Sequence, residues 1–248
     1  MGKVISVASQ KGGVGKSTTT TLLANFFFFH FGLNIAIIDA DYAQFSISKR
    51  REDELKVLPK SKKLQSAYEL LYADRKPYHI VRTKLKNLDT VLEEIIDQYD
   101  YIFLDLAGTM YQPGIFNAYR KINHFLIPVA KDNFSLKSAI EFYQVITQKI
   151  KPTSVYESCF LYFNRVPRRH RINKMLPLLM KKLPFMPIYM SEYLIYETAY
   201  RSTLFPIPKA KMEAVKMLDF AKLVLTNVQN INPSVGDTQA DNTKSVNA

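Results

Sequence analysis

The segment that most constrains the fold of this chain is residues 9–18, which read SQKGGVGKST. The mainly apolar residues 4–7 predict a short buried strand before it, and residues 19–31 contain no Gly or Pro and predict a helix after it. A strand, a glycine-rich turn and a helix N-terminus form a cradle for phosphate groups, because the backbone N–H groups point at the anion. In this cradle Lys16 supplies a positive charge to the phosphates, and Ser17 supplies a hydroxyl for Mg²⁺.

Two further strands are predicted to bring acidic residues to the same place. Residues 35–39 form a continuous apolar run that ends in Asp39, and Asp41 follows soon after. Residues 101–105 form another apolar run, which ends in Asp105. Such runs are typical of parallel strands that helices cover on both faces, and ligands bind beyond the carboxyl ends of these strands. Two carboxylates spaced by one residue at that edge favour a role with Mg²⁺ and water over a role in packing.

The form of the loop, KGGVGKS at residues 11–17, resembles the deviant Walker A motif of the ParA/MinD ATPases. Gln10 stands where the general P-loop pattern has glycine, and a second lysine, Lys11, opens the loop. In that family the extra lysine crosses the interface of a nucleotide-sandwich dimer and contacts the phosphates held by the other subunit. The resemblance therefore implies an ATP-dependent homodimer in which Lys11 and Lys16 are both catalytic. The loop residues implied to bind the nucleotide are Lys11, Gly12, Gly13, Val14, Gly15, Lys16, Ser17 and Thr18.

The two acidic strand ends correspond to the other motifs of this family, and the three motifs stand in the family's order. The resemblance implies that Asp39 and Asp105 join Ser17 around magnesium, and that Asp41 positions or activates the attacking water. The cofactors implied are ATP and Mg²⁺. The resemblance extends over nearly the whole chain, to about residue 229.

The chain departs from the family's pattern at two positions. Residues 42–43, Tyr-Ala, stand where the family usually has a single proline before a glutamine, here Gln44. Ala107 stands where the family often has another proline. The next residue, Gly108, is expected to let the backbone approach the γ-phosphate.

A further nucleotide contact is implied at the end of the apolar run of residues 160–164. In the family an Asn-Arg pair at this strand end lies against the adenine, which makes Asn164 and Arg165 candidates for binding the base. An asparagine after a strand is also common in ordinary turns.

The charge of the chain indicates a polyanionic partner. The formal net charge is +12, which ATP alone does not require, and it favours nucleic acid over a membrane surface. The most basic stretch lies within residues 162–189, which contain no acidic residue. A solubilising basic face is the alternative to a phosphate-binding one. The candidates for DNA binding are Arg168, Arg169, Arg171, Lys174 and Arg201.

The length of 248 residues favours one α/β domain, with a single doubly wound, mostly parallel sheet flanked by helices. We expect this ATPase domain to cover residues 1–229 and a disordered polar tail to cover residues 230–248. The single cysteine, Cys159, excludes a disulfide framework and favours a reducing compartment. No signal segment or membrane-spanning run is visible in the sequence, so a cytoplasmic protein is expected.

The remaining segments predict further elements. Residues 46–86 are basic and predict a variable surface insertion, whose charges favour a solvated face slightly over a DNA contact. Helices are expected at residues 64–72, 88–99, 135–149 and 209–229, and strands at residues 78–81, 124–128 and 160–164.

These features together predict a small partition ATPase of the ParA type. Such a protein would bind DNA non-specifically as an ATP-bound dimer, lie on the nucleoid in that state, and let go after hydrolysis stimulated by a ParB-like adaptor. A MinD-like regulator on the membrane surface is the first alternative, but the last residues, VGDTQADNTKSVNA, have no apolar face to bury. A metabolic P-loop synthetase, which would need a pocket for a small acid, is the second.

Overall fold

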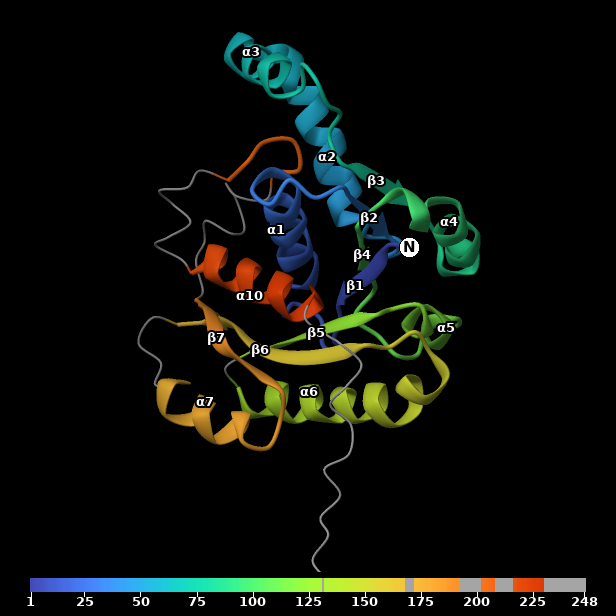
Figure 1. Ribbon diagram of the computed structural model, residues 1–248, viewed down its shortest axis with the longest axis vertical. Coiled ribbons are helices and arrows are strands. Elements are labelled where there is room, and N and C mark those ends of the chain that lie inside the picture. The colour runs from blue at the N-terminus through green and yellow to red at the C-terminus, as the bar shows by residue number, and fades with distance from the viewer. Residues whose placement is uncertain (131, 168–171, 192–201, 208–215, 230–248) are drawn as a thin grey trace, which may run out of the picture.

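The centre of the molecule is a parallel sheet with helices on both faces (Figure 1). The computed structural model describes residues 1–130, 132–167, 172–191, 202–207 and 216–229. The strand order is β3-β2-β4-β1-β5-β6-β7, and every neighbouring pair runs parallel, which confirms the predicted doubly wound sheet. The strands are β1 (Lys3–Val7), β2 (Ile35–Asp39), β3 (His79–Arg82), β4 (Tyr101–Asp105), β5 (His124–Val129), β6 (Ser158–Val166) and β7 (Phe185–Ser191).

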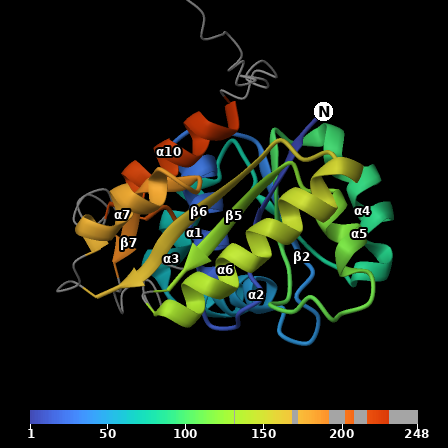
Figure 2. The same ribbon diagram turned by 90° about the horizontal axis from the view of Figure 1, so that it is seen from below.

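The helices divide between the two faces of the sheet. Helices α1 and α10 and the start of α2 pack on one face, while α4, α5, α6 and α7 pack on the other (Figures 1 and 2). No helix within the described ranges is long and apolar enough to cross a bilayer. The helices are α1 (Lys16–Phe29), α2 (Ser46–Val57), α3 (Lys62–Leu71), α4 (Leu88–Ile95), α5 (Ile115–Arg120), α6 (Asn133–Val145), α7 (Ile172–Met180) and α10 (Met217–Gln229).

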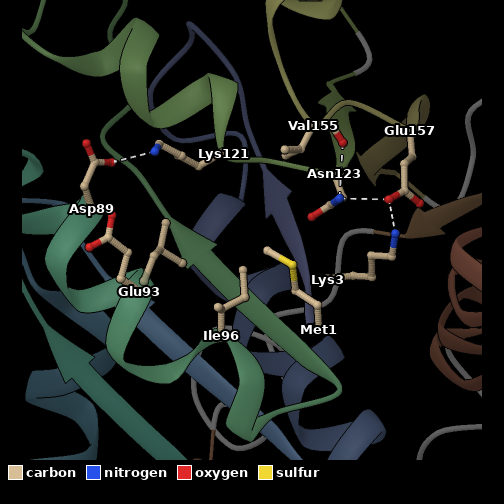
Figure 3. A pocket seen from close by; sticks show the side chains of 11 residues that line it. Met1, Lys3, Asp89, Glu93, Ile96, Lys121, Asn123, Val155 and Glu157 are labelled. Carbon is tan, nitrogen blue, oxygen red and sulfur yellow. Dashed lines mark hydrogen bonds and ion pairs between the residues drawn. The ribbon is translucent and has the colours of Figure 1, made fainter.

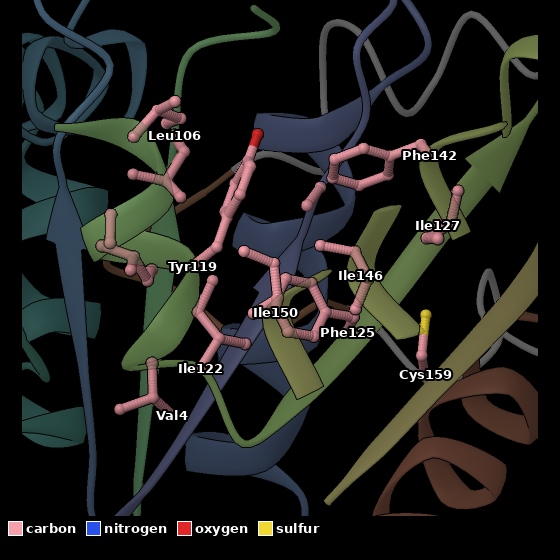
Figure 4. Packing of buried hydrophobic residues seen from close by; sticks show 14 of the residues in the cluster. Val4, Leu106, Tyr119, Ile122, Phe125, Ile127, Phe142, Ile146, Ile150 and Cys159 are labelled. Atoms are coloured by element: carbon pink, nitrogen blue, oxygen red, sulfur yellow. The ribbon is translucent and has the colours of Figure 1, made fainter. Parts of the chain in front are cut away.

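The central strands are apolar because both of their faces are covered. Every residue of β2, β4 and β5 is buried. On one face Tyr119 of α5 and Phe142 of α6 pack edge to face, above Phe125 of β5 (Figure 4). On the other face Phe27 of α1 packs edge to face on Phe103 of β4. Two apolar layers, one on each face, therefore fix the position of the sheet between its helices.

Most of the expected elements are present, with shifted ends. The helix after the glycine-rich loop begins at Lys16, earlier than predicted, so the phosphate-binding lysine lies in its first turn. The helix predicted at residues 135–149 is α6, which continues as a π-helical turn at Ile146–Ile150. The strand expected at residues 78–81 is β3, which joins the main sheet beside β2. The predicted tail of residues 230–248 lies outside the described residues.

Strand β7 is the last described strand of the sheet on the side of β6, and sequence patterns alone did not predict it. It pairs with β6 through an irregular register. Pro187 lies within it and is exposed. Proline has no N–H to donate to a neighbouring strand, so this position suits the edge of a sheet.

Candidate functional site

A cavity of about 640 Å³ opens at the edge of the sheet where β1, β2 and β4 end. The glycine-rich loop forms its floor, and the segments after β2 and β4 form its walls. Folding thus brings together the three motifs predicted from the sequence. The residues that line the cavity are Gly12, Gly13, Gly15, Lys16, Ser17, Thr18, Asp41, Tyr42, Gln44, Ser46, Ala107, Gly108, Thr109, Gln112 and Arg165.

The loop places the Lys16 ammonium against the segment that follows β4. Only 9 % of Lys16 is exposed. A Cβ added at Gly108 would lie 2.7 Å from Lys16 Nζ, a distance that excludes any larger residue at that position unless the ammonium moves. Gly108 therefore provides the space in which the ammonium lies, beside the position where phosphates would be held.

Asn164 supports the glycine-rich loop through a hydrogen bond. Its amide Nδ2 donates to the carbonyl of Val14 at 2.8 Å, and the side chain is buried. Gly15 has a φ of 91°, and a Cβ added there would lie 2.6 Å from the same Nδ2. The amide thus contacts the phosphate-binding loop, and the adenine contact that the resemblance implies for Asn164 stays a prediction.

Arg165, the second residue of that pair, lies at the cavity wall. Its Nη1 donates to the carbonyl of Gly13 at 2.9 Å. Its backbone has a φ of 56°, a left-handed conformation that non-glycine residues adopt rarely. The turn at the end of β6 thus directs this guanidinium toward the loop.

The two buried aspartates lie side by side on neighbouring strands. Asp39 and Asp105 are register partners in β2 and β4, and both are fully buried. Asp39 Oδ2 accepts two hydrogen bonds of 2.8 Å from the backbone N–H and the hydroxyl of Ser48. Asp39 Oδ1 and both oxygens of Asp105 have no hydrogen-bond partner among the described residues. Buried carboxylate oxygens of this kind are suited to a hard cation.

The electrostatics of Asp105 reflect this crowding. Burial raises the pKa of Asp105 to about 7. The nearby Ser17 hydroxyl, which forms no hydrogen bond with Asp105 here, lowers this pKa, and the Asp39 carboxylate raises it further. A cation beside the two carboxylates would stabilise their charged forms.

The donors present fit Mg²⁺ bound together with a nucleotide. The described residues contain no group of three or more His, Cys, Asp or Glu side chains arranged for a metal ion. Magnesium commonly binds to one or two carboxylates and completes its shell with water and substrate phosphates. Ser17, Asp39 and Asp105 are the residues that would hold it here.

Asp41 lies at the cavity wall near the phosphate-binding lysine. It is 7 % exposed, and burial raises its pKa, while Lys16 opposes the rise and Asp39 adds to it. A carboxylate that is partly desolvated and lines the cavity is well placed to orient a water molecule there.

Two residues after Asp41, one of them in the Tyr-Ala pair, have a strained backbone. Ala43 has a φ of 76° and Phe45 a φ of 44°, and neither is glycine. Left-handed conformations at such residues typically cost about 1 kcal/mol or more. The turn nevertheless directs Gln44 to the cavity, where it is one of the lining residues.

Lys11 points away from this cavity. It is not among the lining residues, and its ammonium contacts Asp132, 3.2 Å from Oδ1 and 3.3 Å from Oδ2. Asp132 caps α6 by accepting the N–H of Ser135 at 2.8 Å. That N–H and the Lys11 ammonium lower the pKa of Asp132. Asp132 and Ser48 were not predicted as site residues, although an Asp just before a predicted helix is a recognisable N-cap signal.

Most of the predicted DNA-binding residues fall outside the description of the structure. Arg168, Arg169, Arg171 and Arg201 lie outside the described residues. Lys174 is part of α7, and its side chain is not described. Their role remains a prediction from the sequence.

A second cavity, of about 520 Å³, lies at the opposite edge of the sheet, where the strands begin (Figure 3). Lys121 and Asp89 form an ion pair of 3.3 Å at one end of it. At the other end Asn123 donates to Glu157 at 2.8 Å, and Lys3 pairs with the same carboxylate. None of the predicted site residues lines this cavity.

Comparison with known proteins agrees with the geometry of the first cavity. Residues 5–201 match the model of the CobQ/CobB/MinD/ParA nucleotide binding domain family. The chain belongs to this family. Membership in this family establishes a nucleotide-binding domain.

Solved structures of this family share the fold. A plasmid partition protein from Borrelia burgdorferi bound to AMPPNP is 20 % identical, with a TM-score of 0.65 over 91 % of this chain and 100 % of that chain. The pNOB8 ParA bound to nonspecific DNA is 21 % identical, with a TM-score of 0.59 over 94 % and 100 %. The MinC:MinD cell division complex of Aquifex aeolicus contains a chain that is 19 % identical, with a TM-score of 0.59 over 90 % and 95 %.

Proposed function

We propose that this protein is a partition ATPase of the ParA type, which dimerises around ATP and Mg²⁺ and binds DNA in that state. The observation that carries the proposal is the different direction of the two lysines in one loop. Lys16 lines the cavity of its own chain, whereas Lys11 lies at the rim and is half-exposed. A lysine that does not reach its own cavity is available to a nucleotide held by a second copy.

Within one subunit each group has a distinct task. The backbone N–H groups of the loop and the Lys16 ammonium would hold the triphosphate. Ser17, Asp39 and Asp105 would hold Mg²⁺, which when bound supplies positive charge to the β- and γ-phosphates. Asp41 would orient the attacking water. Hydrolysis would then remove the γ-phosphate contact of the partner's lysine, so that the dimer separates.

DNA binding by the dimer is supported by the charge of the chain and by one similar protein. The net charge is +12, and the pNOB8 ParA was solved with nonspecific DNA. We infer that the basic residues after β6, together with Arg201, contact the phosphate backbone without reading sequence. Bound to DNA, the protein would lie on the nucleoid, and a ParB-like adaptor would stimulate hydrolysis.

The dimer is tested by changing one lysine at a time. Lys11→Ala should keep the ATP affinity of the monomer and lose the ATP-dependent dimer, because the cavity is intact. Lys16→Ala is the matched control and should lose ATP binding itself. Calorimetry measures the affinity and light scattering measures the mass. An ATP-dependent dimer of normal strength in Lys11→Ala would refute the proposed role of Lys11.

The choice of partner separates this function from its two rivals. ATP-dependent sedimentation with DNA favours the ParA type, whereas sedimentation with anionic liposomes favours a MinD-like regulator. ATP turnover that rises with DNA and an adaptor supports the proposal. Turnover that rises only with a small carboxylic acid would assign the protein to the synthetases instead.

A further inference from the structure

The insertion that follows β2 forms a helical arm that projects from the body of the molecule (Figure 1). We define the arm as residues 46–71, which comprise α2, a 3-10 turn at Leu58–Lys60 and α3. Only Ile47 and Ser48, both at the start of α2, are buried, and α3 has no buried residue. We call the far end of the arm, residues 56–63, the tip. No residue of the tip is buried, so its side chains are available to a partner.

The acidic residues of α2 are engaged in ion pairs below the tip. Glu52 pairs with Arg82 at 2.7 Å, and Glu54 with Arg50 at 3.7 Å. Asp53 pairs with Lys56 at 3.2 Å, at the border of the tip. Beyond them residues 55–68 contain no acid. The negative charges of α2 are thus paired below or at the border of the tip, and the next acidic residue of the arm is Glu69 on α3.

Three lysines at the tip have no such counter-charge. Lys60, Lys62 and Lys63 are exposed, and no ion pair or hydrogen bond of their ammonium groups occurs within the described residues. They lie around the start of α3, whose first turn contains no acidic residue. A helix N-terminus carries partial positive charge, so lysines there are electrostatically unfavourable unless an anion is bound beside them.

The base of the arm is part of the nucleotide site. Ser46 lines the first cavity, and Ser48 holds the Asp39 carboxylate through two hydrogen bonds. At 1.5 Å per residue, α2 carries the tip roughly 18 Å away from this point. The arm therefore connects the nucleotide site directly to the three lysines.

The arm is also fixed sideways against the body. Arg51 Nε donates to the hydroxyl of Thr203 at 2.7 Å, and its Nη2 donates to the carbonyl of the same residue at 2.8 Å. The guanidinium also donates to the carbonyl of Tyr78, just before β3. Arg51 thus anchors the middle of α2 to two segments of the body, residues 78 and 203.

From these observations we propose that the tip of the arm is a DNA-contacting surface, in which Lys60, Lys62 and Lys63 bind backbone phosphates. This inference rests on the proposed function and adds a surface separate from the basic stretch after β6. Exposed lysines around a helix N-terminus are suited to phosphate groups. The tip has no aromatic side chain, and its one well-exposed large apolar side chain is Val57, which is 50 % exposed, so it offers far more charge than apolar surface to a partner.

The test compares two triple variants that change the charge equally. The arm variant is Lys60→Glu, Lys62→Glu and Lys63→Glu. The control is Lys86→Glu, Lys149→Glu and Lys222→Glu, three exposed lysines away from the arm with no ion pair within the described residues. Both should bind ATP and dimerise as the wild type does. With ATP, we expect the arm variant to bind a DNA duplex at least ~10-fold more weakly, and to flatten the plot of log K against log salt by roughly 0.9 for each lost phosphate contact.

The outcomes separate this inference from the proposed function. If the wild type binds DNA and the arm variant keeps its affinity and salt slope, the tip is a solvated surface and the inference is wrong. Equal losses in both triple variants would also overturn it, because they would show a response to net charge alone. Loss of binding to anionic vesicles with DNA binding intact would assign the tip to a membrane and refute the inference. A wild type that binds no DNA with ATP refutes the proposed function itself.

Discussion

The Lys11 ammonium and the Asp132 carboxylate form an ion pair of 3.2 Å between the phosphate-binding loop and the start of α6. The pair joins residues far apart in the sequence and is formed within one subunit. Both side chains are about 40 % exposed, and pairs of this kind usually stabilise a protein by only about 0.2–1 kcal/mol. In the proposed function, Lys11 must leave Asp132 before it contacts the nucleotide of a second subunit.

Replacing Asp132 is therefore expected to favour the dimer. Asp132→Ser removes the charge and keeps a hydroxyl that can accept the N–H of Ser135, so the cap of α6 is retained. ATP-dependent dimerisation should occur at a protein concentration up to ~30-fold lower than for the wild type, because each of the two subunits no longer breaks a pair worth at most about 1 kcal/mol. Light scattering across a dilution series measures this. A weaker dimer would mean that Asp132 supports the interface.

Asp41 is expected to act after the nucleotide is bound. Asp41→Ala leaves the loop, Lys16 and the two buried aspartates in place, so ATP binding and the dimer should persist. The rate of hydrolysis should fall by ~10²–10⁴, the usual contribution of a group that orients water. Phosphate release in single-turnover experiments measures this rate. A wild-type rate would move the role to another residue.

Asn164 offers a test between base recognition and support of the loop. Its hydrogen bond to Val14 predicts that Asn164→Ala weakens ATP and GTP binding by a similar factor, of roughly 2–10, because a typical net hydrogen bond contributes about 1 kcal/mol. Calorimetry with both nucleotides measures the two affinities. If only the preference for ATP over GTP is lost, Asn164 contacts the adenine as the family resemblance implies.

His124 predicts a loss of stability in acid. It is fully buried beside Glu157, and burial lowers its pKa from 6.5 to about 4, with Glu157 opposing the shift and Lys3 adding to it. Between these values the unfolded chain binds a proton that the folded chain does not, so stability falls as the pH falls from about 6.5 to about 4. Each unit of pKa difference corresponds to about 1.4 kcal/mol.

The measurement is denaturant unfolding of the wild type and of His124→Gln across this pH range. The variant should lose less stability between pH 6.5 and pH 4, whatever its stability at neutral pH. Parallel curves for the two proteins would show that other groups, such as Glu157, determine the acid response.

The sequence predicted the sheet and the floor of the site well, because both depend on local patterns. The apolar runs that end in Asp39 and Asp105 became adjacent strands, and parallel topology alone placed their carboxylates together. A phosphate-binding loop requires glycines at fixed positions, so the sequence alone predicted that Lys16 and Ser17 lie in this loop beside the cavity.

The parts that were missed depend on contacts between distant segments. Ser48 holds Asp39 from a helix that sequence patterns left unassigned, and Asp132 holds Lys11 across 121 residues. Helix α7 and strand β7 both contain a proline, at Pro177 and Pro187, which weakens the pattern of either element.

Pro187 has a consequence for the assembly of many subunits. An exposed strand at the edge of a sheet can recruit the same strand of another molecule and start an aggregate. At β7 the proline interrupts the row of donors such an addition needs, and on the far side of the sheet β3 is short and carries Arg82 in an ion pair with Glu52. Crowding of many copies on a polymer would therefore bring these sheet edges close together without joining the sheets edge to edge.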